Sequence, residues 1–405
     1  MSRLHFHFDS QIESKIDGNQ LIKAMTQEAT YIWQQPGWPA FRHDPIVVGA
    51  ALANARRAQG VVEGKLAALG FEQRLELAAE AWSQEAVATA AIEGESLDLA
   101  AVRSSVARRL GVGNQDGPNA PRNVEGLLDI MDDAVTRCAN EVTHERLHGW
   151  QAALFPTGYS GMTKIRVGGY REHAEPMQIV SGRMGRERIH YEAPPSAQVP
   201  QEMGRLLQWF NAGTETDALV RAALTHLWFE TIHPFEDGNG RVGRVWVDLV
   251  LARDSGEASR QIRTSQRLLD RRNEYYEHLE RAQHGSLDVT EWVTWFVLQV
   301  KVSCEEASRT IDDTLAKARF WMDHSGKNLT ERQRKAVNVL LDAGPNGFEG
   351  GMSTRKYESI TGTSRATASR ELIELQALGL LAQVGAGRST RYHVNLPGWG
   401  PGGPI

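Results

Sequence analysis

Two helical patterns of apolar residues meet at a short loop near the middle of the chain, and this feature constrains the fold most. Apolar positions of the first pattern recur at helical spacing, at Leu219, Val220, Ala223, Leu224, Leu227 and Trp228. Pro234 ends that helix, because proline disfavours helical geometry at the residue before it, His233. The second pattern is i, i+3, i+4, i+7, i+8, at Val242, Val245, Trp246, Leu249 and Val250. We predict two buried helices joined by a loop that finishes with Asp237-Gly-Asn-Gly240.

Most of the remaining chain is also expected to be helical, so the predicted fold class is mostly α. Long Ala/Leu/Glu/Arg-rich segments such as Glu72–Ala91 dominate, and strand-like alternation is scarce. The 405 residues suffice for two or three domains. A net charge of −5 gives no sign that nucleic acid is the main partner of the whole chain. The start of the chain lacks an apolar signal region, and no apolar run reaches the ~18 residues of a membrane span. We expect a soluble cytoplasmic protein without a membrane partner, with Cys138 and Cys304 as reduced thiols.

Composition and turn signals divide the chain into predicted domains. A Gly/Pro/Asn-rich linker, Gly111–Pro121, separates an N-terminal helical domain (1–110) from a central domain (123–300). In the third domain, 329–395, a capping sequence at Thr330 starts a helix to Asp342. Helices at 353–360 and 364–378 and two short strands around a Gly-Ala-Gly turn follow, as in a winged helix-turn-helix. Residues 396–405 are expected to be a disordered tail.

The residue types around the central loop fit phosphate chemistry. Its glycines let backbone N–H groups turn inward at a helix N-terminus, which creates an anion site. Arg241 and Arg244 would extend that site to more than one phosphate, and Asp237 is placed to hold Mg²⁺. At the other end of the loop, the imidazole of His233 could accept a proton from an attacking hydroxyl. The arrangement predicts phosphoryl or nucleotidyl transfer.

The segment His233-Pro-Phe-Glu-Asp-Gly-Asn-Gly-Arg-Val-Gly-Arg244 resembles the complete Fic family signature, HPFx(D/E)GNGRxxR. Members of this family mostly transfer AMP from ATP to a Ser, Thr or Tyr hydroxyl of a target protein. The resemblance implies that His233 is the general base and that Asp237 holds Mg²⁺. It assigns ATP binding to Gly238, Asn239, Gly240, Arg241 and Arg244, with the two arginines at the β/γ end. The intact Gly-Asn-Gly-Arg argues against Doc-type phosphotransferases.

The resemblance implies functional roles for three further segments. Tyr275-Tyr276 with Gln283 is similar to the family segment near the adenine, which adds Gln283 to the predicted ATP site. Thr89-Ala-Ala-Ile-Glu93-Gly94, at the end of an Ala-rich helix, matches the family's inhibitory motif (S/T)xxxE(G/N). Glu93 would then reach Arg244 and keep ATP in an inactive position.

The third segment is a predicted hairpin, 177–182 with 187–192 around a Gly-Arg-Met-Gly turn. The resemblance implies a flap that docks a target segment by strand addition. Its candidate docking residues are Ile179, Val180, Ser181, Gly182, Ile189, His190 and Tyr191. An ordinary surface hairpin is the alternative interpretation.

The leading hypothesis is an autoinhibited protein adenylyltransferase that modifies a target protein and itself. A second is a transcription regulator whose Fic domain senses nucleotide and whose winged helix acts. A third is an enzyme that removes AMP from a modified target, with Glu93 helping to position water. Between Ser353 and Arg391 there are six Lys/Arg and three acids, which permits contact with DNA or docking to protein. The target, its modified residue and the formation of a homodimer are left open.

Overall fold

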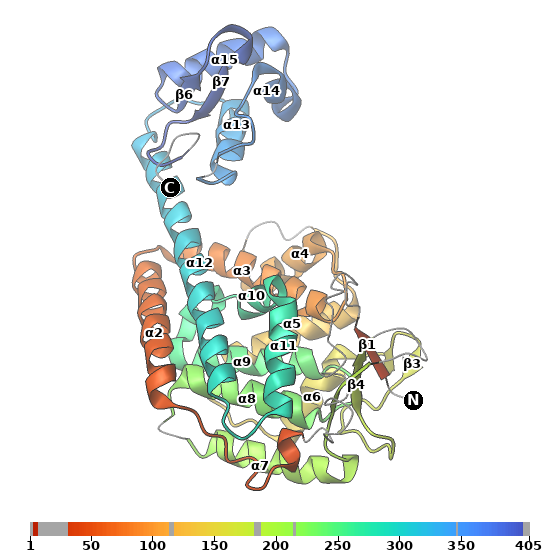
Figure 1. Ribbon diagram of the computed structural model, residues 1–405. Coiled ribbons are helices and arrows are strands. Elements are labelled where there is room, and N and C mark those ends of the chain that lie inside the picture. Colours follow the sequence, from red (N-terminus) through yellow and green to blue (C-terminus); the bar gives the residue numbers. More distant parts are fainter. Residues whose placement is uncertain are drawn as a thin grey trace, which may run out of the picture. The chain divides into compact units, whose positions relative to one another are not determined.

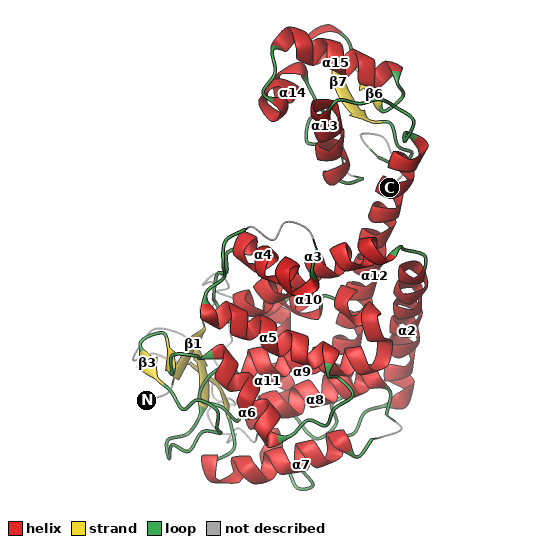
Figure 2. Ribbon diagram, turned by 180° about the vertical axis from the view of Figure 1, so that it is seen from behind, coloured by secondary structure: helices red, strands yellow, loops and turns green. Residues whose placement is uncertain are grey.

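The computed structural model describes residues 3–6, 31–112, 117–181, 188–213, 216–345 and 347–399. The chain divides into two compact units, Met1–Ser308 and Arg309–Ile405. Helices dominate each unit, which confirms the predicted mostly α fold class (Figure 2). No helix among the described residues is long and apolar enough to span a membrane.

The first unit contains the N-terminal helices and the central region (Figure 1). Its helices are α2 (Pro45–Ala67), α3 (Phe71–Ile92), α4 (Leu99–Leu110), α5 (Arg122–Thr136), α6 (His144–Leu154), α7 (Val199–Asn211), α8 (Ala218–Ile232), α9 (Asn239–Ser255), α10 (Thr264–Asp270), α11 (Arg272–His284) and the first part of α12 (Thr290–Asp323). Three 3₁₀ turns join them, η1 (Ile32–Gln34), η2 (Ser196–Gln198) and η3 (Gly256–Gln261). The strands are β1 (Arg3–Phe6), β2 (Tyr159–Ser160), β3 (Thr163–Lys164), β4 (Gln178–Ser181) and β5 (Arg188–Glu192).

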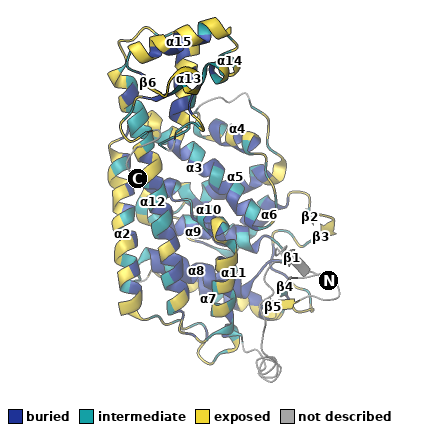
Figure 3. Cartoon of the chain, turned by 45° about the horizontal axis from the view of Figure 1, so that its top comes forward, coloured by how far each residue is buried: buried dark blue, intermediate teal, exposed yellow. Residues whose placement is uncertain are grey.

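Helices α8 and α9 form the centre of this unit, as the two apolar patterns predict. From Leu219 to Ile232 every residue of α8 except Arg221 is buried, and so is most of α9. A helix that is apolar all round must be covered on every side. Helices α7 and α11 cover α8, while α3, α5, α6 and α10 contact α9 (Figure 3). The loop between α8 and α9 therefore lies inside the unit.

The N-terminal helices pack directly on the central ones. Helix α3 contacts α9, α10 and α4, so the two regions on either side of the predicted linker share one compact unit. Of that linker, 111–112 and 117–121 are described, and they connect α4 to α5. The end of α3, where the predicted inhibitory motif lies, is thereby held next to the start of α9.

Two short sheets in this unit lie outside the helical core. Strands β4 and β5 pair antiparallel, with an irregularity between Ile179 and Val180, and this confirms the predicted hairpin. Its turn, including Gly182, lies outside the described residues. Strand β1 pairs in parallel with β4, so the order is β1-β4-β5. Strands β2 and β3 form a separate antiparallel pair.

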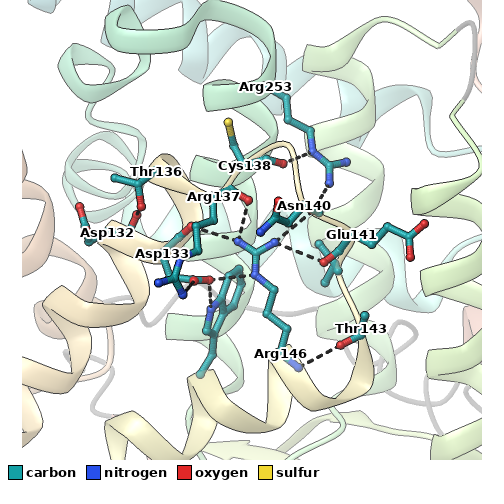
Figure 4. Close-up of polar contacts among 12 residues, drawn as sticks. Asp132, Asp133, Thr136, Arg137, Cys138, Asn140, Glu141, Thr143, Arg146 and Arg253 are labelled. Atoms are coloured by element: carbon teal, nitrogen blue, oxygen red, sulfur yellow. Dashed lines mark hydrogen bonds and ion pairs between the residues drawn. The ribbon is translucent and has the colours of Figure 1, made fainter.

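A polar cluster fixes the connection between α5 and α6 to α9 (Figure 4). The Arg146 Nε and the Trp150 indole both donate to Asp133 Oδ2 at 2.8 Å. Arg146 also donates to the backbone carbonyls of Asp133, Arg137, Asn140 and Glu141. From α9, Arg253 donates to the carbonyls of Cys138 and Asn140. These bonds satisfy the carbonyls of the loop and tie it to α9.

The second unit contains the elements predicted for the C-terminal domain, in the predicted order. They are α13 (Glu331–Asp342), α14 (Thr354–Thr361), α15 (Arg365–Ala377), β6 (Leu381–Val384), the 3₁₀ turn η4 (Gly387–Ser389) and β7 (Arg391–Val394). Thr330 and Gln333 form the expected capping box of α13. The helices share one apolar core with the hairpin and the end of α12. A winged helix-turn-helix that contacts DNA stays a prediction.

Part of the segment that is predicted to be a disordered tail is described in the structure. Of the segment 396–405, residues 396–399 are described, and within them Leu396 and Trp399 pack against the core of the second unit. The rest of the segment lies outside the described residues. The thiols of Cys138 and Cys304 are free, as predicted.

Replacing Asp133 by Ala should lower the free energy of unfolding by about 2–3 kcal/mol, because it leaves the largely buried Arg146 and the Trp150 indole without their acceptor. Burial raises the pKa of Asp133, but its bonds to Trp150 and Arg146 outweigh this and lower it. The stabilisation is therefore fully present above the unfolded-state pKa of about 4 and is lost as pH falls through the lowered pKa of the folded state. Urea denaturation at pH 7 and about pH 2.5 measures both effects.

The matched control is Asp129→Ala on the same helix. Its carboxylate is 61% exposed and pairs with Arg109 at 2.6 Å, so the cost should stay below about 1 kcal/mol. Equal losses in the two variants would show that the cluster does not anchor the loop.

Candidate active site

His233 has an unusual backbone conformation. It caps α8 with φ 49° and ψ 61°, and it is the one non-glycine residue with positive φ among those described. Its N–H donates to the Phe229 carbonyl at 2.9 Å. A side chain in the left-handed region is strained, and such strain gathers at functional sites. The strained turn stops α8 and directs the imidazole into a cavity in front of α9.

A buried guanidinium holds this turn. Arg171 is 1% exposed, and it donates to the carbonyls of His233 at 2.8 Å and Ile232 at 3.2 Å. It also donates to the Pro194 carbonyl and the Ser196 hydroxyl. Burial lowers the pKa of Arg171 to about 10, so it stays charged at neutral pH. A cation at the C-terminal end of α8 also complements the helix dipole.

The remainder of the loop is closed by Asn239. Its side-chain amide donates to the Phe235 carbonyl and accepts from the Phe235 N–H, both at 2.9 Å. Gly238 has φ +90°, and a Cβ there would lie 2.9 Å from the Phe155 ring. The first backbone bond of α9 runs from Val242 N–H to the Gly238 carbonyl. The earlier N–H groups of the helix therefore have no partner within it, which leaves them available to an anion.

One cavity brings most of the predicted site residues together. It is lined by Glu93, Ile179, His190, Tyr191, Glu230, His233, Asp237, Gly238, Asn239, Gly240, Arg244, Tyr275, Tyr276, Leu279, Glu280 and Gln283. The Gln283 side chain is buried, and its amide nitrogen has no partner in the described part of the chain. The Asn239 side chain is occupied by Phe235, so only its backbone remains for a phosphate. Thr89, Gly94, Val180, Ile189 and Arg241 do not line this cavity.

Burial sets the protonation of two groups that line the cavity, His233 and Glu230. It lowers the pKa of His233 to about 4, with a further contribution from the positive charge of Arg171. Burial also raises the pKa of Glu230 to about 8. Neither imidazole nitrogen forms a hydrogen bond within the described residues, and Nδ1 lies 3.6 Å from Glu230 Oε2. At pH 7 the imidazole is neutral and able to accept a proton.

Asp237 fits a divalent cation that also contacts phosphate. Its Oδ1 accepts from the Gly238 N–H at 2.5 Å, and its Oδ2 accepts from the Ser160 hydroxyl. The described residues contain no group of three acidic, His or Cys side chains that could hold a metal by themselves. One carboxylate completed by phosphate oxygens and water is the way in which Mg²⁺ is usually held beside nucleotides.

The end of α3 holds Arg244. The guanidinium donates to the Thr89 hydroxyl at 2.7 Å, to the Thr89 carbonyl at 2.9 Å and to Glu93 Oε1 at 2.7 Å. Burial alone would lower the pKa of Arg244, but the charge and hydrogen bond of Glu93, together with Tyr275 and Tyr276, outweigh burial and raise it. Gly240 makes room for this contact, because a Cβ there would lie 2.0 Å from Glu93 Oε1. The predicted inhibitory residues thus meet the predicted phosphate-binding arginine.

Arg241 lies on the other side of the loop. Its Nη1 donates to Glu95 Oε1 at 3.0 Å, and its guanidinium stacks over the Phe155 ring at 5.0 Å. It lines a neighbouring cavity together with Glu95, Phe155 and Ser160. Its Nη2 is 3.6 Å from Asp237 Oδ1.

The hairpin is anchored to the helical core from one side. Tyr191 is buried and its hydroxyl donates to the Thr231 carbonyl at 2.7 Å. His190 pairs with Glu280 of α11 at 3.0 Å, and Val180 is buried. Ile189 remains 49% exposed. Of the predicted docking residues, Ile179, His190 and Tyr191 line the cavity itself.

Sequence reasoning missed Arg171, Glu230 and Glu95. Glu230 lies one helical turn before His233, and an acid in the otherwise apolar end of α8 was a usable signal. Arg171 and Glu95 lie in irregular segments, where no periodicity indicates what they contact.

Two parts of the chain match protein families. Residues 141–251, which include the whole loop, match the Fic/DOC family. This part of the chain is a Fic domain. Residues 31–112 match a domain of unknown function, DUF4172. A crystal structure of a Fic family protein from Desulfovibrio desulfuricans shares the fold, with a TM-score of 0.51 and 23% identity over 85% of this chain and 95% of that one.

Two curated relatives of this Fic protein are named as adenylyltransferases. A probable protein adenylyltransferase of Aquifex aeolicus is 31% identical over 25% of this chain and 29% of the relative. The protein adenylyltransferase Fic of Nematostella vectensis is 25% identical over 66% of this chain and 55% of the relative. The matched regions span 29% and 55% of the lengths of these two relatives.

Replacing Arg171 by Met should lower the free energy of unfolding by about 3 kcal/mol, because the carbonyls at the end of α8 lose their buried donor. Urea denaturation followed by tryptophan fluorescence measures the loss. Arg166→Met is the control, since Arg166 is 44% exposed and pairs with the exposed Glu172. We expect less than about 1 kcal/mol there. A near-neutral Arg171→Met would contradict its role in holding the turn.

Proposed function

We propose that this Fic protein is an autoinhibited protein adenylyltransferase, which transfers AMP from ATP to a Ser, Thr or Tyr hydroxyl of a target protein and of itself. One observation carries the proposal. A neutral imidazole, that of His233, and a helix N-terminus face one cavity, whose arginine is held by Glu93 at 2.7 Å. The names of the two curated relatives support adenylyl transfer.

In the proposed reaction, the target hydroxyl attacks the α-phosphorus of ATP. A bond forms between the hydroxyl oxygen and phosphorus, the bond to the β-phosphate breaks, and pyrophosphate leaves. His233 accepts the hydroxyl proton, which the low pKa of its imidazole permits at neutral pH. Backbone N–H groups of Gly238, Asn239 and Gly240 stabilise the charge on the phosphates. Asp237 would hold Mg²⁺, which neutralises phosphate charge when bound.

The proposed inhibition follows from competition for one cation. While Glu93 pairs with Arg244, that guanidinium cannot bind the γ-phosphate of ATP. ATP then binds with its α-phosphorus misaligned for in-line attack, and a misplacement of about an ångström can cost on the order of 100-fold in rate. Release of Glu93 would free Arg244 and restore alignment.

The hairpin is the proposed docking element for the target. Its β5 strand faces α11 through the His190–Glu280 pair, and the far edge of β4 pairs with β1. A target segment that adds as a strand to β4 must therefore take the place of β1.

His233→Ala should abolish transfer while ATP still binds, because the imidazole acts on the incoming hydroxyl and not on the nucleotide. Labelled ATP followed by gel autoradiography measures transfer, and calorimetry measures ATP affinity. A loss of affinity as large as the loss of transfer would contradict the role of general base.

The pH profile of the parent protein supplies an independent check. Since the pKa of His233 is about 4, kcat/KM for ATP should be flat from pH 7 to pH 5 and fall as pH drops through 4. Circular dichroism at each pH confirms that the protein stays folded. A midpoint near 6.5 would mean that the reacting imidazole is solvated.

Glu93→Gly should increase self-labelling with ATP, in contrast to truncation of the other residues of the site. Arg244→Ala is the matched control: it breaks the same ion pair but removes a group needed for transfer, so it should not activate. If Glu93→Gly labels no better than the parent protein while ATP binding is intact, the autoinhibition hypothesis is wrong.

A further inference from the structure

The chain turns sharply at the end of α3 and brings a second acid to the site. Glu95 N–H donates to the Ala90 carbonyl and Gly94 N–H to the Ala91 carbonyl, both at 3.0 Å. With Gly94 at φ +81°, this is a Schellman turn. It fixes Glu93 and Glu95 in one rigid unit. Both acids point at the first turn of α9.

The two acids meet two different arginines. Glu93 pairs with Arg244 at 2.7 Å, and Glu95 pairs with Arg241 at 3.0 Å. Arg241 and Arg244 lie one helical turn apart on α9. Glu93 and Glu95 lie two residues apart in the Schellman turn, and this spacing lets each acid reach one of the two arginines. Both guanidiniums are buried, with side chains 5% and 2% exposed for Arg241 and Arg244.

The second ion pair keeps Arg241 away from the nucleotide cavity. Arg241 does not line that cavity, whereas Arg244 does. Instead the Glu95 carboxylate and the Phe155 ring hold it against the neighbouring cavity. To reach a phosphate at the start of α9, its guanidinium must leave Glu95.

We propose that Glu95 is a second inhibitory acid, which restrains Arg241 as Glu93 restrains Arg244, so that one turn at the end of α3 holds both arginines of the Fic motif. This inference rests on the proposed adenylyl transfer and extends it beyond the six-residue inhibitory motif. The two restraints differ in strength. Glu95 is 41% exposed and its pair is weakened by solvent, whereas Glu93 is 17% exposed.

The restraints act in order, and this makes them separable. While Glu93 holds Arg244, ATP stays misaligned whatever Arg241 does, so Glu95→Gln alone should change self-labelling by less than about twofold. Once Glu93 is removed, Arg241 becomes the remaining restrained cation. In the Glu93→Gly background, Glu95→Gln should raise kcat/KM for ATP about threefold, the size expected for a half-exposed ion pair.

The experiment compares the parent protein, Glu93→Gly, Glu95→Gln and the double variant, each with MgATP. Glu72→Gln in the Glu93→Gly background is the control, because it removes the same charge from an exposed acid at the opposite end of α3. We expect no change from it. ATP affinity, measured by calorimetry, should tighten about threefold in the double variant relative to Glu93→Gly.

Two outcomes would overturn the inference. In the first, the double variant equals Glu93→Gly in kcat/KM and in ATP affinity. In the second, Glu72→Gln produces the same gain, which would mean that the effect of Glu95→Gln comes from the change in net charge and not from loss of the ion pair with Arg241. If no variant transfers label, the proposed function has failed, while ATP affinity still decides whether Glu95 restrains Arg241.

Discussion

The geometry of the site depends on one buried cation, Arg171, at the end of α8. A helix that stops inside a protein leaves carbonyls without partners, and here the guanidinium takes those of Ile232 and His233. The same bonds hold His233 in a left-handed conformation that its side chain disfavours. Because Arg171 fixes the backbone of this turn, the imidazole needs no hydrogen bond of its own to face the cavity. The ring nitrogens therefore remain available for chemistry.

The positive charge of Arg244 is balanced by Glu93 in the structure and, in the proposed active state, by phosphate. A buried guanidinium without a partner would cost several kcal/mol, and Glu93 and Thr89 supply that partner to Arg244. In the proposed active state, phosphate replaces the carboxylate. The contact that we propose to block catalysis thus also stabilises the site without nucleotide, which explains why an acid from a distant helix is tolerated against the loop. Removal of Glu93 should carry a cost in stability together with its gain in activity.

Several features of this arrangement could be predicted from the sequence, because they depend on local patterns. The apolar periodicities around Leu227 and Val245 gave the central helix pair, and Pro234 gave the end of α8. The motif from His233 to Arg244 gave the family. The capping box at Thr330 and the hairpin around β4 and β5 were also found.

What could not be predicted depends on contacts between distant segments. Nothing local indicates that Arg171 reaches the end of α8, or that Glu95 reaches Arg241. The sequence also cannot show that the Asn239 side chain closes the loop onto Phe235 instead of facing phosphate. Pro234 predicts that the helix stops, but the left-handed turn at His233 follows from tertiary bonds. The predicted domain boundary at the 111–121 linker does not appear as a division between compact units, since α3 packs on α9.

Gly240 limits which mutations could release the proposed inhibition during evolution. A methyl group there would lie 2.0 Å from Glu93 Oε1 and 2.9 Å from Arg244 Nη1. Any side chain at this position would clash with Glu93, but it would also fill space at the proposed phosphate site. Escape from the proposed inhibition therefore cannot arise at Gly240 without loss of the reaction. Mutations that release activity should accumulate at the end of α3, where the acid can be lost and the loop left intact.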